Sequence, residues 1–163
     1  MLVIPGEVRY LLSRLEQKGY EGYLVGGCVR DALLGLTPKD WDLCTSARPE
    51  EVKACFYDKK LVLSGSRHGT VGVVLDGHLY EITSYRTESG YTDGRHPDSV
   101  TFVRDLKEDL ARRDFTVNAM AYHPAKGLID PFGGKHDLQQ KTIRCVGCQF
   151  QFFFKRNVRI AHR

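Results

Sequence analysis

The pattern of apolar and polar positions along the chain predicts a succession of short helices and strands. Within residues 6–18, apolar side chains recur at helical spacing up to Gly19; they are Val8, Leu11, Leu12 and Leu15. Residues 23–25 are typical of a short buried strand. Residues 29–34 then predict a brief helix that ends at Gly35.

The same patterns predict the remaining elements. Asp76-Gly77-His78 separates two apolar runs and favours a hairpin, whereas residues 86–99 are polar and aperiodic, as in a long functional or mobile loop. In chain order we expect strands at 41–45, 61–63, 70–75, 79–85, 100–103 and 128–129, and helices at 49–57, 105–110, 115–121 and 135–140. Together they indicate an α+β domain with a small mixed, largely antiparallel sheet flanked by helices.

The turn Gly26-Gly27 lies between a predicted strand and a predicted helix. Two glycines at such a place let backbone N–H groups approach a phosphate at the start of the helix. Glycine pairs at strand–helix turns also serve packing alone. The pair by itself therefore leaves both functions open.

Asp40 and Asp42 give a second chemical signal. On an extended strand, residues two apart face the same side, so the two carboxylates converge while Trp41 turns toward the core. Like charges at that separation need a cation between them, and oxygen ligands that share substrate phosphates suit Mg²⁺. A bare Asp-x-Asp is also explained by a solvated turn, but its place after Gly26-Gly27 and Arg30-Asp31 favours the metal site.

Three ordered motifs resemble one family of nucleotidyltransferases. Gly-Gly-x-Val-Arg-Asp-x-Leu-Leu-Gly from Gly26, followed by Asp40-x-Asp42, resembles the first signature of the class II tRNA nucleotidyltransferase (CCA-adding) and bacterial poly(A) polymerase family. Residues 111–121, Ala-Arg-Arg-Asp-Phe-Thr-Val-Asn-Ala-Met-Ala, resemble the second signature. Residues 129–134, Ile-Asp-Pro-Phe-Gly-Gly, resemble the third.

This resemblance implies a polymerase beta-like head domain over residues 1–147 and a role for each matching residue. Asp40 and Asp42 would hold two Mg²⁺ ions, and Glu81 would be the third catalytic carboxylate, although a surface ion pair explains Glu81 nearly as well. Residues 86–99 would match a mobile segment beside the site. The nucleotide-binding residues would be Gly26, Gly27, Arg30, Arg113, Asp114 and Asn118.

The implied reaction is template-independent nucleotidyl transfer that adds CCA to tRNA. The tRNA 3′-hydroxyl attacks the α-phosphate of CTP or ATP, and pyrophosphate leaves. Two metal ions stabilise both the entering and the leaving oxygen, so the protein positions groups and neutralises charge without a covalent nucleophile. The expected cofactor is Mg²⁺ and the expected partners are CTP, ATP and the tRNA 3′ end; a poly(A) polymerase head is the alternative within the family.

The last residues depart from the family pattern. Relatives begin a helical neck with Glu-Asp-x-x-Arg, which selects the incoming base. Alignment at Arg159 puts Lys155 and Arg156 where the acids belong, and a cation cannot accept the amino hydrogen of a base. We therefore expect residues 148–163 to be a truncated or frameshifted remnant of the neck. The alternative to an impaired enzyme is an inactive fragment that binds Mg²⁺–nucleotide or RNA.

Charge and cysteine usage change this picture little. The net charge is +4, but every charged residue after Asp137 is basic, and residues 1–137 carry −2, so global charge indicates a polyanionic partner only weakly. Five irregularly spaced cysteines are typical of reduced thiols, and Cys145-x-x-Cys148 is too little for a zinc or redox site. No apolar run approaches the roughly 20 residues of a membrane span. With no signal-peptide pattern, we expect a cytoplasmic protein with no membrane partner.

Overall fold

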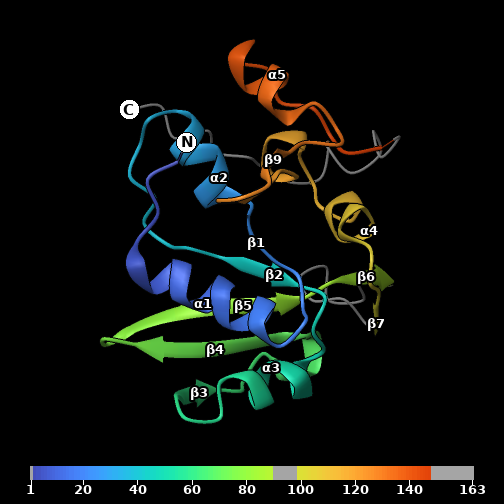
Figure 1. Cartoon of the computed structure of the whole chain (residues 1–163). Coiled ribbons are helices and arrows are strands. Elements are labelled where there is room, and N and C mark those ends of the chain that lie inside the picture. The colour runs from blue at the N-terminus through green and yellow to red at the C-terminus, as the bar shows by residue number, and fades with distance from the viewer. Residues whose placement is uncertain (1, 90–98, 148–163) are drawn as a thin grey trace.

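A computed structural model describes residues 2–89 and 99–147 of the chain (Figure 1). The predicted neck remnant, residues 148–163, and the centre of the predicted loop lie outside the described residues. The helices are α1 Gly6–Gln17, α2 Gly27–Leu33, α3 Pro49–Cys55, α4 Leu106–Ala111 and α5 Gly134–Gln139, with 3₁₀ turns η1 Ser66–His68 and η2 Thr116–Asn118. The strands are β1 Gly22–Val25, β2 Leu43–Thr45, β3 Lys60–Val62, β4 Thr70–Leu75, β5 His78–Ser84, β6 Arg86–Ser89, β7 Ser99–Phe102, β8 Ala121–His123 and β9 Gly127–Ile129.

Seven strands form one sheet in the order β3-β4-β5-β2-β1-β8-β9, and β6 pairs with β7 in a separate two-stranded sheet. Among the described strands, β2 and β5 form the one parallel pair, and the other pairs are antiparallel. Parallel neighbours need a long crossover, which here runs through α3, β3 and β4. The expected mixed, largely antiparallel sheet is confirmed.

The central strands are buried on both faces, and their side chains alternate between two cores. Leu24 and Leu43 pack in the larger core, whereas their neighbours Val25 and Cys44 pack in the smaller one. Helices α1 and α3 cover the larger core, and α4 lies across the opposite face beside β6 and β7 (Figure 1). The two faces of the sheet therefore carry different helices.

The prediction of a helix over residues 115–121 is wrong. Phe115 is extended and bridges Cys145, and a single 3₁₀ turn follows at Thr116–Asn118. Residues Ala121–His123 then form β8 between β1 and β9. The apolar residues at this place satisfy both a helical and a strand pattern, and pairing with two sheet neighbours decides between them.

Two further boundaries differ from expectation. The predicted strand over residues 41–45 begins at Leu43, so Asp40 and Asp42 precede β2 instead of lying within it. The predicted loop over residues 86–99 contains β6, whose residues Arg86–Ser89 pair with β7. Polar strands on a two-stranded ribbon lack the apolar alternation on which strand prediction depends. Within the described ranges, no helix has the length and apolar character needed to cross a membrane.

Candidate active site

Two carboxylates lie in register where β2 and β5 run parallel. Leu43 pairs with Ile82, so the preceding residues Asp42 and Glu81 are neighbours across the two strands. Leu43 and Ile82 both pack in the larger core. Since side chains alternate along a strand, Asp42 and Glu81 face the opposite side of the sheet, toward α4.

Asp40 completes a group of three negative charges around this point. Trp41 packs against the larger core, which is the alternation expected from the Asp-x-Asp spacing. Although Asp42 is an exposed residue overall, desolvation of its carboxyl by the surrounding protein is the largest cause that raises its pKa. The charges of Glu81 and Asp40 raise the pKa further, and the charge of Arg113 opposes them.

The turn between β1 and α2 brings backbone beside these carboxylates. Gly26 adopts φ 78° and ψ −133°, a conformation that side chains rarely allow. Its N–H donates to the carbonyl of Met120 at 3.3 Å, so the Gly26 amide is already used inside the protein. The N–H groups that open α2 at Gly27 have no preceding turn to supply an acceptor. The backbone of Val25 meanwhile donates to the Asp42 carbonyl at 3.0 Å and fixes the two segments together.

Arg30 and Asn118 lie together although they are far apart in the sequence. Arg30 Nη1 donates to Asn118 Oδ1 at 2.7 Å, and Arg30 Nη2 forms an ion pair with Asp31 at 2.8 Å. A Cβ placed on Gly27 would lie 3.6 Å from Arg30 Nη2, so the guanidinium borders the glycine turn. The structure thus joins the first and second sequence motifs at one place.

Arg113 and Asp114 occupy different positions despite being adjacent. Arg113 Nη1 lies 3.3 Å from where a Cβ on Gly26 would be, and its charge acts on Asp42. Asp114 is exposed, and its carboxylate accepts from the N–H of Phe115 at 2.8 Å. Arg113 therefore borders both the glycine turn and the carboxylates, whereas Asp114 caps the local backbone.

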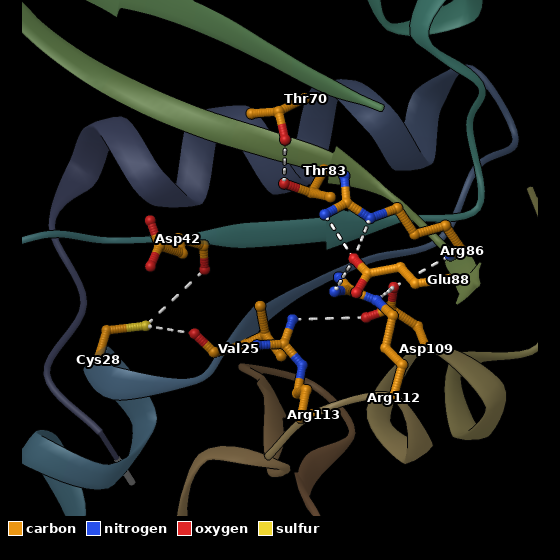
Figure 2. A network of polar contacts seen from close by, with 10 residues as sticks. All are labelled: Val25, Cys28, Asp42, Thr70, Thr83, Arg86, Glu88, Asp109, Arg112 and Arg113. Atoms are coloured by element: carbon orange, nitrogen blue, oxygen red, sulfur yellow. Dashed lines mark hydrogen bonds and ion pairs between the residues drawn. The ribbon is translucent and has the colours of Figure 1, made fainter. Parts of the chain in front are cut away.

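Sequence reasoning missed a network of charged residues behind Arg113 (Figure 2). Asp109 is fully buried and pairs with Arg112 and Arg113, and Glu88 pairs with Arg112 and Arg86. The spacing of Asp109 to the two arginines, three and four residues along a helix, was a signal that could have found part of it. Glu88 lies only two residues from Arg86, but its ion pair with Arg112 joins segments that are far apart in the sequence, and no local spacing signals that pair.

The donor set at the carboxylates fits a divalent cation. Among residues 2–89 and 99–147, no three His, Cys, Asp or Glu side chains form a ready metal-binding group. Desolvation, then the charges of Glu81 and Asp40, raise the pKa of Asp42. A cation bound by the oxygen donors of Asp40 and Asp42 would relieve the repulsion among these charges. Mg²⁺ is commonly held by one or two carboxylates, with water and substrate phosphates supplying the other ligands.

The sequence of residues 22–144 matches the family described as the poly A polymerase head domain. The chain belongs to this poly A polymerase head domain family. The matched range begins at β1 and includes the glycine turn, the three carboxylates and both arginines described above. The family expected from the sequence motifs is therefore confirmed.

Similar proteins share the head over most of this chain. A CCA-adding enzyme of Pediococcus pentosaceus is 49% identical over 154 residues, which are 94% of this chain and 38% of that protein. A CCA-adding enzyme of Geobacillus stearothermophilus is 51% identical over 137 residues, which are 84% of this chain and 33% of that protein. The match thus spans 33–38% of the length of these two relatives.

Solved structures of CCA-adding enzymes have the same fold. The Bacillus stearothermophilus enzyme in complex with CTP matches with a TM-score of 0.77 and 48% identity, covering 86% of this chain and 33% of that one. The Thermotoga maritima enzyme complexed with tRNA matches with a TM-score of 0.67 and 29% identity, covering 88% of this chain and 34% of that one. The expected nucleotidyltransferase head fold is confirmed.

Proposed function

We propose that this chain is the catalytic head of a nucleotidyltransferase that adds CCA to the 3′ end of tRNA from CTP and ATP. The observation that carries the proposal is that Asp42 and Glu81 directly precede the paired residues Leu43 and Ile82 of the parallel strands. The charges of Glu81 and Arg113 both act on Asp42, and Arg113 borders the Gly26-Gly27 turn. Relatives that are about half identical to this chain are CCA-adding enzymes. The chain's place in this family supports a divalent-metal mechanism, and we propose Mg²⁺ as the ion.

In this proposal, Asp40 and Asp42 hold the metal and Glu81 is the third catalytic carboxylate. The pairing of Leu43 with Ile82 supports this role, because Asp42 and Glu81 directly precede these residues and the charge of Glu81 acts on Asp42. The repulsion between the two carboxylates is a cost that bound cations remove. Bound Mg²⁺ would polarise the 3′-hydroxyl and neutralise charge on the triphosphate. The protein's own contribution is to keep the carboxylates on one face of a sheet whose other face is packed in the larger core.

The nucleotide lies, we propose, along the glycine turn. Gly26 shapes the turn, and Gly27 leaves space in which a phosphate approaches the backbone. Arg113 supplies positive charge, and Arg30 is held beside the turn by Asp31 and Asn118. The whole proposed nucleotide-binding set is Gly26, Gly27, Arg30, Arg113, Asp114 and Asn118.

Two further expectations accompany this function. We propose residues 1–147 as the head domain and residues 148–163 as a segment of the neck that has lost its base-selecting motif. Because tRNA and nucleoside triphosphates are substrates inside the cell, we also propose the cytoplasm as the compartment. A poly(A) polymerase head is the second candidate, favoured by the description of the matching family.

An extension assay tests the proposal. The chain is incubated with Mg²⁺, labelled CTP and ATP, and either tRNA that lacks its 3′ end or an unrelated RNA. We expect extension that Asp42→Asn abolishes, because the amide cannot replace an ionised metal ligand. Asp58→Asn serves as a matched control, since Asp58 pairs with Arg14 away from the carboxylates and its loss should leave extension unchanged.

The outcomes distinguish the candidates. Addition of CMP and AMP to trimmed tRNA supports the CCA-adding head, whereas addition of AMP alone to unrelated RNA supports the poly(A) polymerase. Extension that survives Asp42→Asn contradicts the proposed site. No extension at high protein concentration, together with Mg²⁺-dependent binding of CTP, identifies an inactive fragment.

A further inference from the structure

Asp109 is a carboxylate in an unusual place. Its side chain has 0% exposure, and it lies on α4 among the residues of the smaller core, between Leu106 and Leu110. Burial of an ionised carboxylate is unfavourable unless charged partners and hydrogen bonds compensate for lost water. The groups that contact Asp109 therefore show what compensates for its burial.

Three groups from two segments meet at Asp109 (Figure 2). Its Oδ1 accepts from the backbone N–H of Arg86 at 3.1 Å and from Arg112 Nε at 3.2 Å. Its Oδ2 accepts from Arg113 Nη2 at 3.4 Å. Oδ1 thus links the end of α4 to the start of β6, and Oδ2 contacts Arg113.

The two arginines then extend to different neighbours. Arg112 Nη1 binds Glu88 at 2.7 Å, and Glu88 also binds Arg86 at 2.7 Å, so Arg112 is paired at both ends. Arg113 instead borders Gly26, with its Nη1 3.3 Å from the position of a Cβ there. Of the two, Arg113 is the one that reaches the proposed nucleotide site.

Arg113 has donor capacity that the protein does not use. Its Nε is buried and has no hydrogen-bond partner within the described part of the chain, and its bond to Asp109 is long. Arg30, in contrast, donates through Nε and Nη2 to Asp31 and through Nη1 to Asn118. Arg113 is held by one long bond to Asp109, and its Nη1 borders the glycine turn. A guanidinium in that position suits a multiply charged oxyanion at the turn.

We propose that Asp109 is a positioning residue that orients Arg113 toward the triphosphate of the incoming nucleotide. The inference rests on the proposed function, because it takes the glycine turn as the nucleotide site. Asp109 does not touch the nucleotide. It holds Arg113 by one oxygen, while its other oxygen ties α4 to the start of β6.

Asp109→Asn separates the contact with Arg113 from the link between α4 and β6. Its amide oxygen can still accept from Arg86 and Arg112, but its NH₂ group cannot accept from Arg113. Glu88→Gln is the matched control, because it changes another carboxylate of the same network, the one that binds Arg86 and Arg112. Asp109→Glu keeps the charge and moves it by one methylene, and it serves if the asparagine variant does not fold.

The test is Mg²⁺-dependent CTP binding by the intact chain, measured by calorimetry for wild type and each variant. We expect Asp109→Asn, or Asp109→Glu in its place, to weaken binding about tenfold, as for loss of one charge-assisted contact. The CTP affinity of Glu88→Gln should stay within about twofold of wild type, because the proposal gives Glu88 no part in orienting Arg113. In the Arg113→Gln background, the change at Asp109 should have no further effect.

Several results would contradict either the proposed nucleotide site or the positioning role of Asp109. No CTP binding by the wild type contradicts the proposed nucleotide site itself. Binding by the wild type that is unchanged at Asp109, or losses at Asp109 and Arg113 that add, overturns the positioning role. Equal losses for Asp109→Asn and Glu88→Gln also overturn it, because they would reflect the network's stability alone.

Discussion

The two faces of the seven-stranded sheet differ in composition. The face under α1 and α3 packs a large core of aliphatic and aromatic side chains, among them the fully buried Phe56. The face toward α4 packs a small core and, beside it, carries Asp42, Glu81 and the network around the buried Asp109. Hydrophobic burial is therefore concentrated on one side, whereas Asp42, Glu81 and the buried Asp109 lie on the other.

This division has a physical logic. Carboxylates that repel one another destabilise the site they form, and a well-packed core on the reverse of the same strands offsets that cost. Leu43 and Ile82 anchor the strands in the larger core at the residues that follow Asp42 and Glu81. Mutations on the two faces should accordingly separate stability from activity.

The largest expected effect lies on the packed face. Phe56→Ala removes a fully buried ring and should lower the free energy of unfolding by about 3–5 kcal/mol. Tyr57→Ala is the control, because its neighbouring ring is 78% exposed and its loss should cost little. Urea unfolding measures both, and a similar loss for the two variants would contradict the assignment of this face as the main source of stability.

The opposite face should respond in activity instead. Glu81→Gln removes one of the converging negative charges, and we expect transfer to fall on the order of 100-fold, equivalent to about 2.7 kcal/mol. Thermal stability should be unchanged or slightly higher, since repulsion on Asp42 is relieved. Transfer rates and melting temperature check this, and normal transfer by a folded variant removes Glu81 from the catalytic group.

Gly134→Ala should lower both the stability of the fold and the affinity for CTP. An added Cβ would lie 2.1 Å from the Thr116 carbonyl oxygen and 3.0 Å from Met120 Cγ, so the turn that carries Asn118 must move. We expect a loss of about 1–3 kcal/mol in unfolding free energy, with a parallel loss of CTP affinity. Gly6→Ala is the control, because a Cβ there meets no atom within 4 Å. Lost stability with unchanged affinity would show that the turn is independent of the site.

The smallest expected effects concern the pH dependence of stability. Ionisation of Asp137 should stabilise the fold, whereas ionisation of Asp42 should destabilise it. Burial acts to raise the pKa of Asp137, but hydrogen bonds from Thr116 and Arg144 outweigh it and lower the pKa. The stabilisation from Asp137 is thus complete above its ordinary pKa of about 3.9 and disappears as pH falls through the lower folded value. Asp42 has a raised pKa, so its ionisation destabilises the fold as pH rises above that ordinary value.

Unfolding of Asp137→Asn and Asp42→Asn at neutral and acidic pH measures this contrast. At neutral pH we expect Asp137→Asn to lose about 1–2 kcal/mol and Asp42→Asn to gain stability. Both differences from wild type should vanish in acid. A gain for Asp42→Asn that persists in acid would mean that its origin is not the charge.

Much of the fold and site could be predicted from sequence because local patterns and ordered motifs agree. The helix over residues 6–18 follows from its apolar spacing, and the glycine turn follows from its place between a strand and a helix. The structure also brings Arg30 and Asn118 together. Their roles remain proposals.

What could not be predicted depends on distant neighbours. Residues 121–123 form a strand because β1 and β9 flank them, which no local pattern contains. Asp109 shows its spacing to Arg112 and Arg113 in the sequence, but its burial depends on packing against the sheet. Burial makes this helical ion pair a contact between α4, the start of β6 and Arg113.

The order of the strands also has a consequence during synthesis of the chain. Strand β1 leaves the ribosome early, yet one of its two neighbours, β8, is made only after β2 through β7. Until β8 arrives, that side of β1 is an open edge with unpaired backbone groups, which invites association with other chains. Nascent chains that stop before residue 121 should therefore depend on chaperones, even though both proposed catalytic strands have already been translated.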